Sequence, residues 1–225
     1  MQGGIVTVSV YYIRWKNSDI RAIMSYAQKL TLLRQKKVMR YRQEADRARC
    51  VLGELLLRFA RKRASQGFCE PTLDEYGKPH LPDAYFSLSH SGNVVVLAYG
   101  DKEVGVDVEQ RQDHIEECMH VLSVGEQMAI CTAPEELKQE RFIQLWTLKE
   151  SYLKMLGTGF LVDPSSISIE IHDNYFVIPA QEGGDTVYLS SIVLHEAYYL
   201  GLCAKEPEMQ IEMIALSELE NSLKD

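Results

Sequence analysis

The sequence has no apolar run of the roughly 18 to 20 residues that a membrane span requires. Its start, MQGGIVTVSVYYIRWK, lacks a basic region followed by a long apolar core. We therefore expect a cytoplasmic protein that does not act at a membrane. The five cysteines are widely spaced and form no C-x-x-C pair, which argues against a disulfide framework and a zinc knuckle. Because linker-like tracts are missing as well, the 225 residues should fold as one large unit or two halves.

Positive charge is concentrated in one part of a chain whose net charge is −8. Between Lys29 and Arg63 there are twelve Lys/Arg and three acids, so this basic stretch carries +9 and the remainder −17. Such a distribution favours a compact anion or an acidic protein partner over a nucleic-acid duplex, and we expect no nucleic-acid ligand. A basic helix face that is merely solvated explains the same counts equally well.

Hydrophobic periodicity predicts an α+β fold. Alternation predicts a strand over 5–13 with Val6, Val8 and Val10 on one side, and apolar residues three and four apart predict a helix over 43–63. Further helices are expected over 126–130 and 135–156. Short strands are expected over 86–88, 94–99, 104–108, 167–171, 175–178, 187–194, 198–203 and 211–214, with turns at SHSGN and GDKE. Each half then combines helices with a small, mainly antiparallel sheet, and the changeover lies near residue 104.

The predicted strand VGVDVEQ places two carboxylates on one face. Because side chains alternate along a strand, its valines lie on one side and Asp107 and Glu109 on the other, about 7 Å apart. Such a pair can share one hard cation, such as Mg²⁺, if waters or phosphates fill the remaining positions. For a D-x-E pattern taken alone, a half-buried strand with a wet acidic face is the simpler interpretation.

Two further segments carry candidate site residues. In FIQLWTLKESYLKMLGTG, Glu150 and Lys154 lie on one helix face, which is also explained by an ordinary ion pair worth about 0.3 to 0.5 kcal/mol. In FSLSHSGN, Ser89 and His90 can donate hydrogen bonds to an anion, and Gly92 lets the backbone approach closely. An ordinary turn histidine is the simpler interpretation of His90. The sequence has no G-x-S-x-G, so serine hydrolase chemistry has little support.

The blocks GKP, FSLSHSG, VGVDVE and WTLKESYLK, in this order and spacing, resemble the 4′-phosphopantetheinyl transferases of the long, surfactin-activating type. The matching blocks cover residues 77–109 and 142–159. The resemblance implies two pseudo-symmetric α+β halves, each a small, mainly antiparallel sheet packed with a long helix, and an active site in the cleft between them. We place the halves at residues 1–104, with the nucleotide-phosphate-binding residues, and 105–225, with the metal-binding and catalytic residues.

The resemblance also implies a reaction. The phosphopantetheine arm of coenzyme A would move to a serine of an apo acyl or peptidyl carrier protein, and adenosine 3′,5′-bisphosphate would leave. Asp107, Glu109 and Glu150 are expected to ligate Mg²⁺, with Glu150 and Lys154 as catalytic residues, where Glu150 or a water that it orients takes the serine proton. The cofactor-binding residues that the resemblance implies are Arg34, Lys37, Lys78, Pro79, Ser89, His90 and Lys154. Position 50 is Cys, where a close relative is expected to have a small hydroxyl residue.

Two other functions would use the same residues. A coenzyme A or nucleotide-binding module would hold the ligand without turnover, and a magnesium phosphodiesterase would activate water instead of serine. Because carrier proteins are acidic helical bundles, the basic stretch is expected to attract them, with Ile115, Met119 and Val121 forming an apolar docking surface. Since one chain contains both halves, a monomer is expected.

Overall fold

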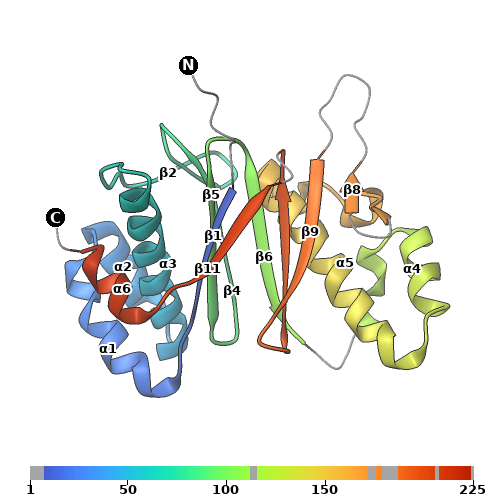
Figure 1. The fold of residues 1–225 in the computed structure, drawn as a ribbon, viewed down its shortest axis with the longest axis horizontal. Coiled ribbons are helices and arrows are strands. Elements are labelled where there is room, and N and C mark those ends of the chain that lie inside the picture. Colours follow the sequence, from blue (N-terminus) through green and yellow to red (C-terminus); the bar gives the residue numbers. More distant parts are fainter. Residues whose placement is uncertain (1–7, 112–115, 172–175, 179–186, 206–207, 224–225) are drawn as a thin grey trace.

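The computed structural model describes residues 8–111, 116–171, 176–178, 187–205 and 208–223. Its strands form two larger sheets in the middle of the molecule, with helices on both outer sides (Figure 1). The strand orders are β11-β1-β5-β4 and β6-β10-β9-β8-β7, and β2 and β3 form a small separate hairpin. This architecture confirms the predicted mixture of α and β structure. The strands are β1 Val8–Arg14, β2 Thr72–Leu73, β3 Pro79–His80, β4 Tyr85–Ser91, β5 Val94–Gly100, β6 Val104–Gln110, β7 Glu170–Ile171, β8 Phe176–Ile178, β9 Val187–Leu194, β10 Tyr198–Ala204 and β11 Met209–Met213.

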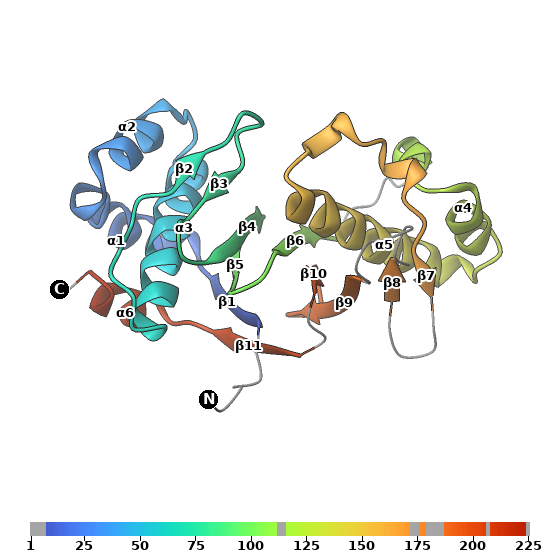
Figure 2. The ribbon, with the colours of Figure 1, turned by 90° about the horizontal axis from the view of Figure 1, so that it is seen from above.

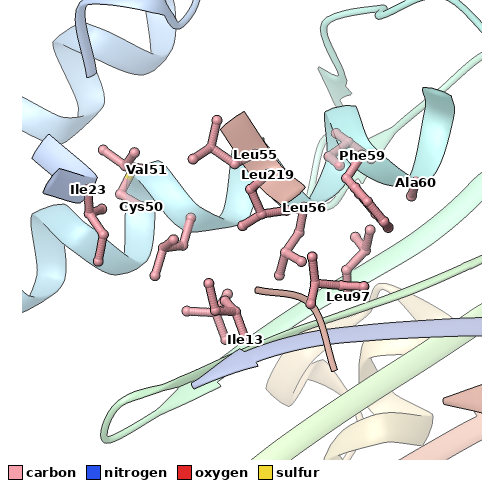
Figure 3. Packing of buried hydrophobic residues seen from close by; sticks show 14 of the residues in the cluster. Ile13, Ile23, Cys50, Val51, Leu55, Leu56, Phe59, Ala60, Leu97 and Leu219 are labelled. Atoms are coloured by element: carbon pink, nitrogen blue, oxygen red, sulfur yellow. The ribbon is translucent and has the colours of Figure 1, made fainter. Parts of the chain in front are cut away.

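Four helices lie on the outer side of the first sheet: α1 (Ile20–Ser25), α2 (Leu32–Arg40), α3 (Glu44–Arg63) and α6 (Leu216–Asn221). Helix α3 packs against β1 and β5, and the other three pack against α3. The long helix α3 was predicted from its apolar spacing. It begins with acidic residues and ends with basic ones, which suits the helix dipole. Leu56 of its buried face lies near Ile13 and Leu97 of the sheet, and Leu219 of α6 fills the same core (Figure 3).

The two sheets pack against each other through a core of their own. Val10 and Val96 of the first sheet and Val106 and Leu200 of the second belong to this buried cluster. Because side chains alternate along each strand, the opposite face of each sheet is left for the helices. The result is four layers, with helices outside and two sheets inside. Helix α5 (Glu135–Leu156) covers the second sheet, and α4 (Val124–Cys131) packs against α5 (Figure 2).

Several predicted boundaries are confirmed, among them α5 and β9. In β1, Val8 and Val10 are buried as expected, while Val6 lies outside the described residues. Helix α4 begins before the predicted residue 126 because Ser123 caps it. The Ser123 hydroxyl accepts a hydrogen bond from the Glu126 N–H, and the Glu126 carboxylate accepts one from the Ser123 N–H.

The last strand of the chain returns to the first sheet. Strand β11 pairs with β1 in parallel, whereas the other pairs of both larger sheets are antiparallel. Helix α6 follows and buries Leu219 in the first core. The end of the chain therefore packs with elements that begin near residue 8, although it lies far beyond the changeover predicted near residue 104.

Two sequence expectations about strands are wrong. The expected turn at SHSGN is strand as far as Ser91, and only Gly92 and Asn93 connect β4 to β5. The expected strand over 167–171 is reduced to β7. Its earlier backbone groups serve a buried ion pair, because the Ile167 carbonyl accepts from Lys149 Nζ and the Ile169 N–H donates to the Glu126 carboxylate.

All five cysteines are free, as their spacing predicts. Among the described residues, no helix combines the length and the apolar character needed to cross a membrane.

Candidate active site

Helix α5 lies directly on the second sheet because two glycines leave room for it. A Cβ atom at Gly105 would lie 1.8 Å from the Ser151 carbonyl oxygen, and one at Gly201 would lie 2.3 Å from the Thr147 carbonyl oxygen. The face of β6 that carries Gly105 also carries Asp107 and Glu109, as the alternation predicts. Close packing of α5 therefore brings its polar side chains next to these two carboxylates.

Asp107 is the most buried of the three predicted metal ligands, with 3% of its surface exposed. Its Oδ1 accepts hydrogen bonds from Ser89 Oγ at 2.8 Å and from Lys154 Nζ at 2.5 Å. Its Oδ2 is buried without a hydrogen-bond partner, and so is Glu150 Oε1. An unsatisfied buried polar atom costs about 1 to 3 kcal/mol, more when it is charged, so two such carboxylate oxygens indicate a place for a ligand.

The carboxylates also repel one another. Burial, followed by the charge of Asp107, raises the pKa of Glu109 to about 7, although Ser91 and Lys154 oppose the shift. Burial and then Asp107 likewise raise the pKa of Glu150, again opposed by Lys154. Three acids that disfavour each other's charge, with one lysine beside them, leave an excess of negative charge that a divalent cation would neutralise.

One pocket brings most of the predicted site residues together. Trp146 and Leu88 form its apolar part. The predicted residues that line it are Ser89, His90, Asp107, Glu109, Glu150 and Lys154. Within the described parts of the chain, no three His, Cys, Asp or Glu side chains are grouped closely enough to enclose a metal ion by themselves. This open arrangement fits Mg²⁺, which typically takes one or two carboxylates and completes its shell with waters and phosphates.

A second, mostly apolar pocket adjoins the first and shares Leu88, Glu150 and Lys154 with it. Two predicted cofactor residues, Lys78 and Pro79, line this second pocket together with Tyr76, Phe86 and Leu153.

Lys78 ties the β2–β3 hairpin to the end of α5. Its Nζ donates to the Met155 carbonyl at 2.6 Å, where a cation suits the negative end of the helix dipole. Its methylene chain crosses Gly157, where a Cβ would lie 2.5 Å from Lys78 Cδ and where the backbone has a positive φ of 77°. Burial lowers the pKa of Lys78. The sequence predicted a role in cofactor binding for this lysine but not its contact with α5.

Arg34 and Lys37 are not brought to either pocket. Arg34 Nε donates to Glu54 Oε2 at 3.2 Å, and its guanidinium reaches Cys50 Sγ at 3.8 Å. Glu54 is 2% exposed and also pairs with Arg58 at 2.9 Å. Lys37 is exposed on α2. The structure thus gives Arg34 a structural ion pair that the charge count did not reveal.

Other arginines of the basic stretch also have structural partners. Arg61 is buried and holds Asp83 with two hydrogen bonds. Arg49 donates to the Gly92 carbonyl at 2.9 Å and to Asp46 at 2.6 Å. The concentration of positive charge in this stretch is therefore explained partly by packing.

His90 lies at the rim of the first pocket, close to cations. Burial, then Arg49 and to a smaller extent Lys154, lower the pKa of His90, so its neutral form prevails at pH 7. Arg49 was missed as a neighbour of the site because it lies on α3 and reaches β4 only in the folded chain.

The docking surface expected from Ile115, Met119 and Val121 is not an open apolar face. Met119 and Val121 are half-buried against the core beneath α5, and Ile115 lies outside the described residues. More exposed apolar side chains in this part of the molecule are Val124 and Met128 of α4.

Comparisons with known proteins point to one family. The family model described as the 4′-phosphopantetheinyl transferase superfamily matches residues 103–203, which include the three carboxylates and Lys154. The 4′-phosphopantetheinyl transferase Sfp of Bacillus subtilis is 28% identical over 196 residues, which cover 83% of this chain and 88% of that protein. The transferase gsp of Aneurinibacillus migulanus is 26% identical over 230 residues, covering 97% and 96%. The transferase psf-1 of Bacillus pumilus is 29% identical over 194 residues, covering 82% of each. The family-model match over residues 103–203 and the 26–29% identity over most of the chain support a 4′-phosphopantetheinyl transferase of the long, Sfp-like type.

Proposed function

We propose that this enzyme transfers the 4′-phosphopantetheine arm of coenzyme A to a serine of an apo acyl or peptidyl carrier protein, with Mg²⁺, and releases adenosine 3′,5′-bisphosphate. The observation that carries the proposal is the single pocket where Asp107, Glu109, Glu150 and Lys154 meet with two carboxylate oxygens left unpartnered. The family-model match of the chain and the printed activity of its relatives support the same reaction.

We propose further that the site lies in a cleft between two related halves, residues 1–104 and 105–225. In support, each half supplies one wall of the pocket: β4 comes from the first, and β6 and α5 come from the second. Each half also has an antiparallel group of strands with one long helix against it, α3 in the first and α5 in the second. Strand β11 is the exception to this division.

In the reaction, the serine oxygen would form a bond to the β-phosphorus of coenzyme A, and the bond from that phosphorus to the leaving bisphosphate would break. Asp107, Glu109 and Glu150 line the pocket where Mg²⁺ would bind, and one or two of them, completed by waters and phosphate oxygens, would hold it. The bound cation would supply the charge that neutralises the diphosphate oxygens. Lys154 adds a flexible cation next to the same oxygens. Glu150, whose pKa is raised and whose Oε1 is unpartnered, is suited to accept the serine proton.

The nucleotide end of coenzyme A would occupy the second, mostly apolar pocket, against Lys78 and Pro79. His90, with cations beside it, would contact a phosphate. Lys37 has an exposed side chain available to a phosphate, whereas Arg34 already donates to Glu54.

The carrier would approach the exposed part of the basic stretch. Arg40 and Arg42 are exposed, so an acidic helical partner can meet them directly. Reversal of both charges should weaken carrier affinity and leave coenzyme A affinity unchanged. We also propose that the enzyme acts as a cytoplasmic monomer, because both walls of the pocket come from one chain.

One assay tests the transfer. The protein is incubated with coenzyme A, Mg²⁺ and an apo carrier protein, and the carrier is weighed by mass spectrometry. A gain of one phosphopantetheine supports the proposal, and a carrier with its serine replaced by alanine should stay unlabelled. Coenzyme A binding without labelling would identify a binding module, and loss of coenzyme A without labelling would identify a phosphodiesterase.

A further inference from the structure

Strands β4 and β6 meet where the two sheets join, and serine hydroxyls make the connection. In the ladders, β4 pairs with β5 and β6 pairs with β10, although β4 and β6 lie side by side (Figures 1 and 2). The hydroxyl oxygens of Ser87, Ser89 and Ser91 accept hydrogen bonds from every second N–H group of β6. The donors are Val106 at 3.1 Å, Val108 at 3.4 Å and Gln110 at 3.1 Å. We call this set the serine joint.

The register of the serine joint matches each serine with one residue on the α5 face of β6. Ser87 bonds the N–H that follows Gly105, and Ser89 bonds the N–H that follows Asp107. Ser91 bonds the N–H that follows Glu109. A hydroxyl has one hydrogen to donate after its oxygen has accepted.

Two of these hydroxyl hydrogens go to carboxylates. Ser89 donates to Asp107 Oδ1 at 2.8 Å, and Ser91 donates to Glu109 Oε2 at 2.9 Å. The residue matched with Ser87 is glycine, which has no side chain to accept. The serine joint therefore holds one oxygen of each carboxylate in place by its own geometry.

We propose that Ser91 is a positioning residue that fixes the Glu109 carboxylate so that its other oxygen faces the cation site. This inference rests on the proposed function, which assigns a cation to the site. It adds a residue to which the family resemblance gave no role. Ser91 would act through Glu109, because its hydroxyl hydrogen is donated to that carboxylate. A hydrogen bond to a ligating carboxylate typically affects metal affinity by about 10- to 100-fold, because the ligand otherwise loses its orientation.

Ser87 supplies a matched control. Ser91→Ala and Ser87→Ala each remove one hydroxyl that accepts from a β6 N–H, but only the first removes a hydrogen bond to a carboxylate. The measurement is Mn²⁺ affinity of the purified full chain by electron paramagnetic resonance, with and without coenzyme A. We expect Ser91→Ala to weaken Mn²⁺ binding by about 10-fold. Ser87→Ala should change it by less than about twofold.

A second pair of variants separates the hydroxyl from the shape of the side chain. Ser91→Thr keeps the donor and should bind Mn²⁺ like the parent, whereas Ser91→Val has nearly the same shape and should be as weak as Ser91→Ala. This pair also serves if Ser91→Ala fails to fold, because both residues favour strands.

The inference would be overturned if Ser91→Ala and Ser87→Ala bound Mn²⁺ with equal affinity, or if Ser91→Thr and Ser91→Val did. It would also be overturned if the parent failed to bind Mn²⁺ both with and without coenzyme A. The outcome is distinct from that of the proposed function. If the parent labels a carrier but the variants bind Mn²⁺ equally, only the role of Ser91 fails. If the parent binds Mn²⁺ but labels no carrier, the transfer fails and the comparison still decides the role of Ser91.

Discussion

Two of the lysines of helix α5, Lys149 and Lys154, lie five residues apart in opposite environments. Lys149 has no exposed surface, pairs with Glu126 at 2.7 Å and donates to the carbonyls of Val121, Pro164 and Ile167. Lys154 is about one-third exposed and pairs with Asp107. Both oxygens of Glu126 have partners, whereas Asp107 Oδ2 has none.

The difference distinguishes an ion pair whose groups are all satisfied within the protein from one that leaves an acceptor for a ligand. We call the Lys149 pair closed, because the Lys149 ammonium and both Glu126 carboxylate oxygens have partners within the protein. These contacts connect α4, α5 and the segment that follows α5. The Lys154 pair is open, because Asp107 Oδ2 has no hydrogen-bond partner and both residues line a pocket. Burial and charge are similar in the two acids, so only the balance of donors and acceptors separates them.

The largest expected effect separates the two acids. Asp107→Asn should lower carrier labelling on the order of 10³-fold, because several kcal/mol of charge stabilisation are lost. Its free energy of unfolding should change little. Glu126→Gln should do the reverse, with activity per folded molecule retained. Labelling rates and urea unfolding of both variants check this, and full activity of Asp107→Asn would refute the open pair.

The two lysines provide the next test. Lys149→Met leaves a buried, unpaired Glu126, which should lower the free energy of unfolding by about 3 to 5 kcal/mol. The double variant Lys149→Met with Glu126→Leu should recover much of that loss. Lys154→Met should cost far less stability, since its pair is partly exposed, and should abolish labelling. Equal stability of both single variants in urea would show that the distinction between the pairs is mistaken.

A third test moves α5, which carries Lys154, away from β6, which carries Asp107. Gly105→Ala forces a Cβ into the Ser151 carbonyl, so it should cost about 1 to 3 kcal/mol and separate Glu150 and Lys154 from Asp107. Gly125→Ala in α4 is the control, because its added Cβ would meet no atom within 4 Å beyond its neighbours in the chain and the backbone of its own helix. That change should stabilise the protein by about 0.5 to 1 kcal/mol. Thermal unfolding and labelling together report the two effects.

The smallest effect concerns pH. Burial and the neighbouring cations lower the pKa of His90 in the free protein. A bound phosphate would offset the charge of those cations and raise the pKa of His90, so binding would be coupled to the uptake of a proton. Coenzyme A affinity should therefore rise a few-fold as the pH falls from 8 to 6.5. His90→Gln should flatten this dependence in calorimetric titrations. A dependence of the opposite sign, or one unchanged by the substitution, would place His90 away from the phosphates.

Much of the site could be predicted because its signals are local. The alternation of VGVDVEQ determines that Asp107 and Glu109 share a face, and helical spacing determines that Glu150 and Lys154 do. The strand character of Ser89 and His90 could not be predicted in this way, because their backbone and hydroxyl partners lie on other strands. The alternating serines of β4 were the available signal, but their meaning depends on β6.

The sequence by itself determined the long helices, the face of each strand and the family, because periodicity and motif order are properties of neighbouring residues. Only the tertiary structure decided that the ion pair of Lys149 is closed and that of Lys154 is open. It also decided that Arg34 pairs with Glu54 and that β11 joins the first sheet. These outcomes depend on partners far apart in the chain. Whether a buried charge is satisfied is a property of all the groups around it, and no local pattern contains them.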